Sequence, residues 1–282
     1  MKFEQIRVGV WIYGLATVAT GILDVVWREF EASHQPFKAL GKNIPGEHVL
    51  AVLAGICLIA AGIAILSRST ARTGAKGAAV LYVIFALFWV PRLFAMIHAI
   101  GLRIGVTVFG LGKCGEELLL AAGGLLVYAA TATPDSISGR RAGIAARWML
   151  GLPPIAFGLG HLVSLHGYMP FVPHWIPFAA FWVVLTGTAF LLAGCAIVSG
   201  IQDVLAARML ALMFFLFELM VEIPPIFAHP RSQGAWGGAA YNLTAIGVCW
   251  IFAEFIGGRL GQRNDSDLAE DFATVGSDAT AG

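Results

Sequence analysis

Long apolar stretches separated by short polar segments dominate the chain from Val8 to Gly257. A helix needs roughly 20 mostly apolar residues to cross a hydrocarbon core of about 30 Å. The stretches have this length, and the polar segments between them are too short to form domains of their own. The pattern therefore predicts about eight transmembrane helices, in the approximate windows 8–27, 48–67, 77–99, 116–133, 144–165, 175–199, 205–228 and 237–257.

Two segments do not fit this pattern. The apolar run Ile104–Leu111 is short and interrupted by glycine, so we expect a loop or a re-entrant segment there. Residues 263–282 are polar and acidic, with Asp265, Asp267 and Glu270 among them. Such a composition cannot bury enough apolar surface to order a chain, so we expect a disordered tail.

Composition supports an integral membrane protein. Hydrophobic residues make up 58% of the chain and charged residues only 12%, whereas soluble domains carry about 25% charged residues. The first apolar stretch, 8–27, is longer than the core of a signal peptide, so we interpret it as a retained span. The net charge of +1 and the absence of a basic stripe exclude a nucleic-acid partner, and the lipid bilayer is the first predicted partner.

The distribution of Lys and Arg predicts the orientation. Basic residues in short loops favour the cytoplasmic side of a membrane. The segments 68–76 and 140–147 are both basic and fall on the same side as the N-terminus in an eight-helix arrangement. We therefore predict a multi-pass protein of the inner (plasma) membrane with both termini in the cytoplasm.

The two halves of the chain share short motifs. Residues Ala61–Ser67 match Ala193–Ser199, and Gly21–Asp24 aligns with Gly158–His161. Each half contains four predicted spans, an even number, so both halves have the same orientation in the membrane. This pattern predicts a parallel internal repeat.

The expected fold is an all-α bundle made of two tandem four-helix halves, residues 1–139 and 140–262, related by a pseudo-two-fold axis along the membrane normal. The halves differ at polar positions. Asp24 of the first half stands where the second half has His161, and Glu117 stands where the second half has Asn242.

The second half carries a family resemblance. Its segments Phe157–His161 and Val172–Pro177, followed by the helix from Thr186 to Gly194, resemble the DoxX/DoxD-like family of four-helix membrane proteins. The resemblance covers roughly residues 8–257, and the first half is the more diverged copy. It implies an all-α membrane bundle, and a link to quinone-coupled sulfur oxidation or to membrane oxidoreductase complexes. It implies no catalytic residue.

Ionisable residues inside the predicted spans are the candidates for function, because they are rare and costly in a bilayer. Glu218 and Glu222 are four residues apart, so they share a helix face and repel each other unless a cation or proton intervenes. Pro224 and Pro225 follow and free backbone carbonyls nearby. We expect Arg92 to pair with a carboxylate such as Asp24 or Glu117, for stability as much as for function. The candidate proton- or ligand-binding residues are Asp24, Arg92, Glu117, His161, Glu218, Glu222, His229 and Asn242.

The same residues have a structural interpretation, because polar side chains near helix ends reach the interface and a single histidine can form a hydrogen bond across helices. No H-x-x-x-H or H-E-x-x-H spacing occurs within a predicted helix, so no metal site is predicted. Heme, flavin and nucleotide motifs are also absent. The cofactor stays open, and a quinone is compatible with the sequence. All seven histidines fall on the predicted outer side: His34, His48, His98, His161, His166, His174 and His229.

Three functions are compatible with this pattern. The first is a quinone- or sulfur-linked redox component with a polar pocket at the extracytoplasmic end. The chain carries no electron carrier motif, so the carrier comes from a redox partner protein or is the quinone itself. The second is a transporter or binding protein for a small solute or a lipid. The third is a non-catalytic partner in a membrane complex. The sequence leaves open whether the protein is an enzyme.

Overall fold

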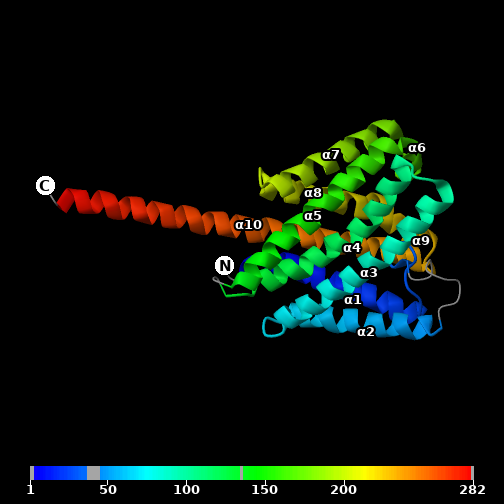
Figure 1. Cartoon of the computed structure of the whole chain (residues 1–282), viewed down its shortest axis with the longest axis horizontal. Helices are drawn as coiled ribbons and strands as arrows, with labels where there is room; N and C mark the ends of the chain where they lie inside the picture. Colours follow the sequence, from blue (N-terminus) through cyan, green and yellow to red (C-terminus); the bar gives the residue numbers. More distant parts are fainter. Residues whose placement is uncertain (1–2, 37–44, 134–135, 281–282) are drawn as a thin grey trace.

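The computed structural model describes residues 3–36, 45–133 and 136–280, and within these ranges the chain is helical without strands. Figure 1 shows one elongated bundle with the last helix projecting from it. The elements are η1 (Phe3–Ile6), α1 (Arg7–Trp27), α2 (Glu47–Leu66), α3 (Ala71–Ile100), α4 (Ile104–Ala130), α5 (Ile137–Val163), α6 (Leu165–Tyr168), η3 (Met169–Phe171), α7 (Ala179–Ser199), α8 (Asp203–Phe217), η4 (Glu218–Glu222), α9 (Ile223–Ala228) and α10 (Gln233–Thr280).

The predicted membrane class is confirmed at the level of helix length and composition. Within the described residues, seven segments are long and apolar enough to cross a membrane: α1, α2, α3, α5, α7, the continuous 203–228 segment from α8 to α9, and the first half of α10. The eighth long helix, α4, differs because it carries Lys113, Glu116 and Glu117 near its middle. It is also among the most buried helices of the bundle, so these charges are surrounded by protein.

The prediction of a loop at Ile104–Leu111 is wrong, because this run forms the first turns of α4. Its glycines are points of close helix contact. Gly110 faces Leu93 of α3, and further along the helix Gly115 faces Pro153 of α5. Small residues at such points let two helices approach closely, which is their usual role in membrane bundles.

The C-terminal end also differs from the expectation. Residues 263–280, which composition predicts to be disordered, continue α10 as a helix that projects beyond the bundle (Figure 1). Residues 281 and 282 of the predicted tail lie outside the described part of the chain.

The helices pack in chain order around the bundle. Each of α1, α2, α3, α4, α5, α7, α8 and α10 contacts the next, and α10 returns to α1. In addition, α4 contacts α10, so these two helices meet in the middle of the bundle. The core therefore lies along α4 and α10, which carry many of the fully buried side chains, such as Leu119, Leu126 and Phe252.

Paired glycines fix the closest helix crossings. In the first half, Gly14 of α1 lies against Gly62 of α2, and Gly21 lies against Gly55. A Cβ atom at Gly21 would lie 2.5 Å from the carbonyl oxygen of Gly55, so a larger residue does not fit. In the second half, α5 and α7 cross in the same way, through the pairs Gly151–Gly194 and Gly158–Gly187.

One end of the bundle, which we call the histidine end, collects the seven histidines. The helices α1, α3, α5 and α9 end there, and α2, α4, α7 and α10 begin there. Connections at the opposite end are short, such as 67–70 and 200–202, whereas the 164–178 connection at the histidine end is longer. Lys38 and Lys42, which lie on the predicted outer side, are outside the described residues.

The segment 28–36 after α1 folds into the histidine end of the bundle. Phe30, Glu31 and Gln35 in this segment are buried, with 4%, 7% and 2% of their surface exposed. The Glu31 carboxylate accepts hydrogen bonds from the backbone N–H groups of Ser33 and His34. The indole of Trp89 on α3 donates to the His34 carbonyl. These bonds hold the segment against the helices.

Arg147 joins four helices near the opposite end. Its guanidinium lies 2.7 Å from the Asp203 carboxylate at the start of α8 and donates to the Ile197 carbonyl of α7 at 2.6 Å. It also lies over the ring of Phe252 on α10.

We expect the Arg147→Met variant to be less stable by about 1–2 kcal/mol, because it removes hydrogen bonds to a charged group and leaves Asp203 without its partner. Thermal unfolding in detergent micelles measures the change. Arg141→Met on the exposed face of α5 is the control and should unfold at the wild-type temperature. Equal unfolding temperatures for both variants would contradict this role of Arg147.

Candidate functional site

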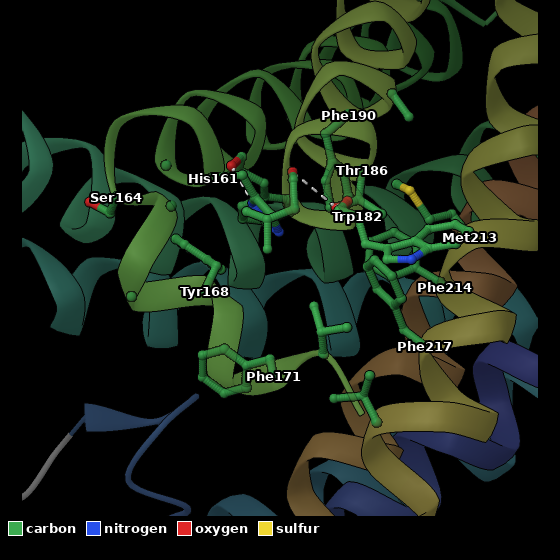
Figure 2. A pocket seen from close by; sticks show the side chains of 18 of the residues that line it. His161, Ser164, Tyr168, Phe171, Trp182, Thr186, Phe190, Met213, Phe214 and Phe217 are labelled. Atoms are coloured by element: carbon green, nitrogen blue, oxygen red, sulfur yellow. Dashed lines mark hydrogen bonds between the residues drawn. The ribbon is translucent and has the colours of Figure 1, made fainter. Parts of the chain in front are cut away.

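A cavity of about 860 Å³ occupies the histidine end between α4, α5, α7, α8 and α10, and α6 closes part of it. Figure 2 shows the side chains from α5 to α8 that point into it. We call it the aromatic cavity. The aromatic side chains that line it are Phe109, Phe157, Tyr168, Phe171, Trp182, Phe190, Phe214, Phe217 and Tyr241.

Part of the lining of the aromatic cavity is also exposed on the outside of the bundle, on α7 and α8 as well as at Phe109 and Phe171. Three of its lining residues, Trp182, Leu185 and Leu216, are also exposed on the outside of the bundle, by 40%, 45% and 44%. Both helices belong to segments that are apolar enough to cross a membrane. The exposed part of the lining on α7 and α8 is therefore apolar surface on segments of membrane-spanning length.

His161 of α5 is the principal polar group on the α5 wall. Its Nδ1 lies 2.7 Å from the Phe157 carbonyl oxygen, and its ring stacks on Tyr168 at 4.0 Å (Figure 2). A carbonyl oxygen can only accept, so Nδ1 carries the hydrogen of this bond. Burial and the nearby Glu116 carboxylate raise the pKa of Tyr168, so its hydroxyl is a protonated donor at neutral pH.

The α4 wall carries an ionic network. Lys113 Nζ lies 2.8 Å from Glu116 Oε2, and His34 Nδ1 lies 3.2 Å from the same oxygen. The His34 ring stacks on Tyr241 of α10, with centroids 4.6 Å apart. Lys113, Glu116 and Tyr241 line the aromatic cavity, whereas His34 reaches them from the 28–36 segment behind. This wall can therefore offer charged and hydroxyl groups to a ligand.

A second, small chamber lies behind this wall. Its volume of about 20 Å³ is room for one water molecule. Gln35 Nε2 donates to Asp24 Oδ2 at 3.1 Å. Within the described ranges, Asp24 Oδ1, Glu117 Oε1 and the Tyr241 hydroxyl have no hydrogen-bond partner. All three residues line the chamber, so a bound water is the natural partner for these atoms.

The structure divides the eight predicted site residues into three groups. Asp24 and Glu117 line the small chamber, and His161, Glu222 and Asn242 line the aromatic cavity. The remaining three, Arg92, Glu218 and His229, line neither.

Each of these three has a different environment. Arg92 is exposed and forms no ion pair with Asp24 or Glu117 in the described part of the chain, so the expected pairing is replaced by the Gln35–Asp24 hydrogen bond. His229 is exposed. Glu218 is buried, and it begins a π-helical turn, η4, just before the Pro224–Pro225 pair. Such wide turns often accompany functional sites.

Sequence reasoning missed the residues that complete both sites. Glu31, His34 and Gln35 lie in a polar segment that looks like an ordinary loop, and only its run of polar groups directly after a span marks it. The aromatic lining, exemplified by Phe190 and Phe214, is indistinguishable by sequence from side chains that face lipid, because both are apolar.

Comparison of the chain with models of known protein families, with curated proteins and with solved structures gives no match. The resemblance to the DoxX/DoxD-like family therefore rests on the sequence motifs alone and stays a prediction. Within the described residues, no three or more His, Cys, Asp or Glu side chains are grouped as metal ligands.

Proposed function

We propose that the chain is a DoxX-like protein with eight spans in two four-helix halves related by a parallel repeat, with α4 as the eighth span. The glycine crossings support the repeat. The sequence distance from Gly14 to Gly151 equals that from Gly21 to Gly158. The partner glycines on α2 and α7 are likewise equally spaced. The histidine end is then extracytoplasmic, with both termini in the cytoplasm.

The function that this geometry supports best is binding of a lipid-soluble ring compound of the quinone class, as part of a redox system. The single observation that carries the proposal is the aromatic cavity, whose apolar lining is also exposed on the outside of α7 and α8. Its volume of about 860 Å³ lies within the range of small-molecule sites. Stacked aromatic rings suit a flat ring, and an isoprenoid tail could lie along the exposed apolar surface of α7 and α8.

The polar groups of the cavity suit the oxygens of such a ring. Lys113 and Tyr168 can donate hydrogen bonds, and His161 and Glu116 can exchange protons. The electrons would come from, or pass to, a partner protein in the membrane. A small-solute or lipid-binding role uses the same cavity without electron transfer, and the binding experiment below separates it from the quinone proposal.

Quenching of tryptophan fluorescence by decylubiquinone tests the proposal on purified protein in nanodiscs. We expect saturable quenching in the wild type, because Trp182 lines the cavity. Ala189 also lines it, and Ala189→Phe would fill the space that the ring needs, so we expect at least a tenfold weaker apparent affinity.

Ala60→Phe is the matched control, because Ala60 is exposed on α2 and the same change there leaves the cavity untouched. Equal quenching in the wild type and in Ala189→Phe would overturn the proposal. If a neutral lipid binds saturably and the quinone does not bind, the lipid-binding function is supported in place of the quinone proposal.

A further inference from the structure

The small chamber and the aromatic cavity occupy equivalent places in the two halves. Thr20 and Asp24 of α1 line the chamber. At the same spacing along α5, Phe157 and His161 line the aromatic cavity. The same sequence distance separates Gly14 from Gly151 and Gly21 from Gly158 at the glycine crossings.

Local packing agrees with this correspondence. Gly55 of α2 lies against the Cβ atom of Asp24, and Gly187 of α7 lies against the Cβ atom of His161. The two polar side chains therefore leave their helices at the same point of the same kind of crossing. Asp24 and His161 are the equivalent polar groups of two equivalent pockets.

The pockets differ in what fills them. In the first half, the 28–36 segment occupies the space, and only about 20 Å³ remains. Its Gln35 places an amide N–H on the Asp24 carboxylate at 3.1 Å. In the second half, the connection between α5 and α7 also contributes to the lining, with Tyr168 stacked on His161 and Phe171 63% exposed, but about 860 Å³ remains. The second half thus has room for a ligand where the first half is filled by its own segment.

We infer that the ligand of the aromatic cavity donates a hydrogen bond from a hydroxyl group to Nε2 of His161, as Gln35 donates to Asp24 in the first half. The ligand is then a lipid-soluble phenol or quinol, the hydroxyl-bearing form of a ring compound. This inference rests on the proposed function and specifies which form of the ligand the site prefers.

The chemistry of His161 supports a donor ligand. Nδ1–H is used by the Phe157 carbonyl, so an uncharged ring presents Nε2 as an acceptor. Aromatic rings surround the imidazole, and no acidic side chain forms an ion pair with it in the described part of the chain, which favours the uncharged ring. A carbonyl group at this position would face a lone pair, whereas a hydroxyl group would satisfy it.

Two probes that differ only in the donor test the inference. We would measure the affinity of 4-dodecylphenol and of its methyl ether for the protein in nanodiscs, by their effect on the tryptophan fluorescence, to which Trp182 of the cavity lining contributes. We expect the phenol to bind about threefold to tenfold more tightly in the wild type, the range that one hydrogen bond supports. Equal affinity for phenol and ether in the wild type would overturn the inference, whatever the variants do.

His161→Phe removes the acceptor and keeps a stacking ring, so we expect the preference for the phenol to disappear while the ether still binds. His166→Phe is the control, because His166 is exposed on α6 and lies outside the cavity lining, and it should keep the preference. A preference that survives in His161→Phe also contradicts the inference. If decylubiquinone binds and the wild type has equal affinity for the phenol and the ether, only this inference fails. If no ring compound binds, the proposed function fails as well.

Discussion

Replacing Gly21 with valine will destabilise the protein by about 3 kcal/mol, at the upper end of the usual range for overpacking. A Cβ atom at this position would lie 2.5 Å from the Gly55 carbonyl oxygen and 2.9 Å from the backbone of Ile59. Both neighbours are backbone atoms of α2, so no side chain can turn away and the two helices must separate. Valine is a slightly better helix former than glycine, so propensity does not explain a loss.

Gly158→Val tests the equivalent crossing of α5 and α7, where a Cβ atom would lie 2.5 Å from the Gly187 carbonyl oxygen. We expect a loss of similar size. Gly257→Val in α10 is the control, because nothing lies within 4 Å of a Cβ atom there. Thermal unfolding in a single detergent measures all three variants. If Gly21→Val unfolds at the same temperature as Gly257→Val, the close contact between Gly21 and Gly55 does not determine the stability of the bundle.

These crossings show how far the sequence predicts the fold. Apolar length alone predicts the helices, since the bilayer demands about 20 apolar residues for each span. The matching motifs around Gly62 and Gly194 predict which helices resemble each other. The glycines of the 104–111 run were misleading, because they suggested a break in the helix. Sequence does not distinguish a glycine that ends a helix from one that allows a neighbouring helix to approach.

The site was predictable only where polarity is unusual. Asp24, Glu117 and His161 attract attention because ionisable groups are rare in apolar helices, and all three line a pocket. The role of Gln35 was not predictable, since whether a polar loop stays in solvent or folds into a bundle depends on the space that distant helices leave. Arg92 was predicted as a site residue but is exposed, because a charged residue within an apolar window can still point outward.

Helix α4 can carry three charges in the middle of the bundle because each of them is paired or enclosed by protein. Lys113 and Glu116 form an ion pair at 2.8 Å, one turn apart, with 18% and 16% of their side chains exposed. Glu117 points into the small chamber on the other side of the helix wall. The charges are therefore neutralised or enclosed where α4 contacts α5 and α10, and the lipid-facing surface need not carry them.

Removing Glu116 will destabilise the protein by about 3–5 kcal/mol, because the Lys113 charge loses its partner at 2.8 Å. We expect this loss for Glu116→Leu and a smaller one for Lys113→Met, because His34 Nδ1 remains 3.2 Å from the Glu116 carboxylate. The double variant, Lys113→Met with Glu116→Leu, should recover most of it, since two apolar side chains replace a paired charge. A double-mutant cycle on the free energies of unfolding measures the coupling between the two residues.

The exposed pair of Arg7 and Glu4 provides the control, because its side chains are 61% and 55% exposed and water already solvates both charges. Arg7→Met should change stability by less than about 1 kcal/mol. If the losses of the two single variants of α4 simply add in the double variant, the charges act independently and the pair does not explain their burial. If the double variant is stable, it also separates folding from ligand binding, since it keeps the aromatic rings of the cavity and removes the charged wall that faces them.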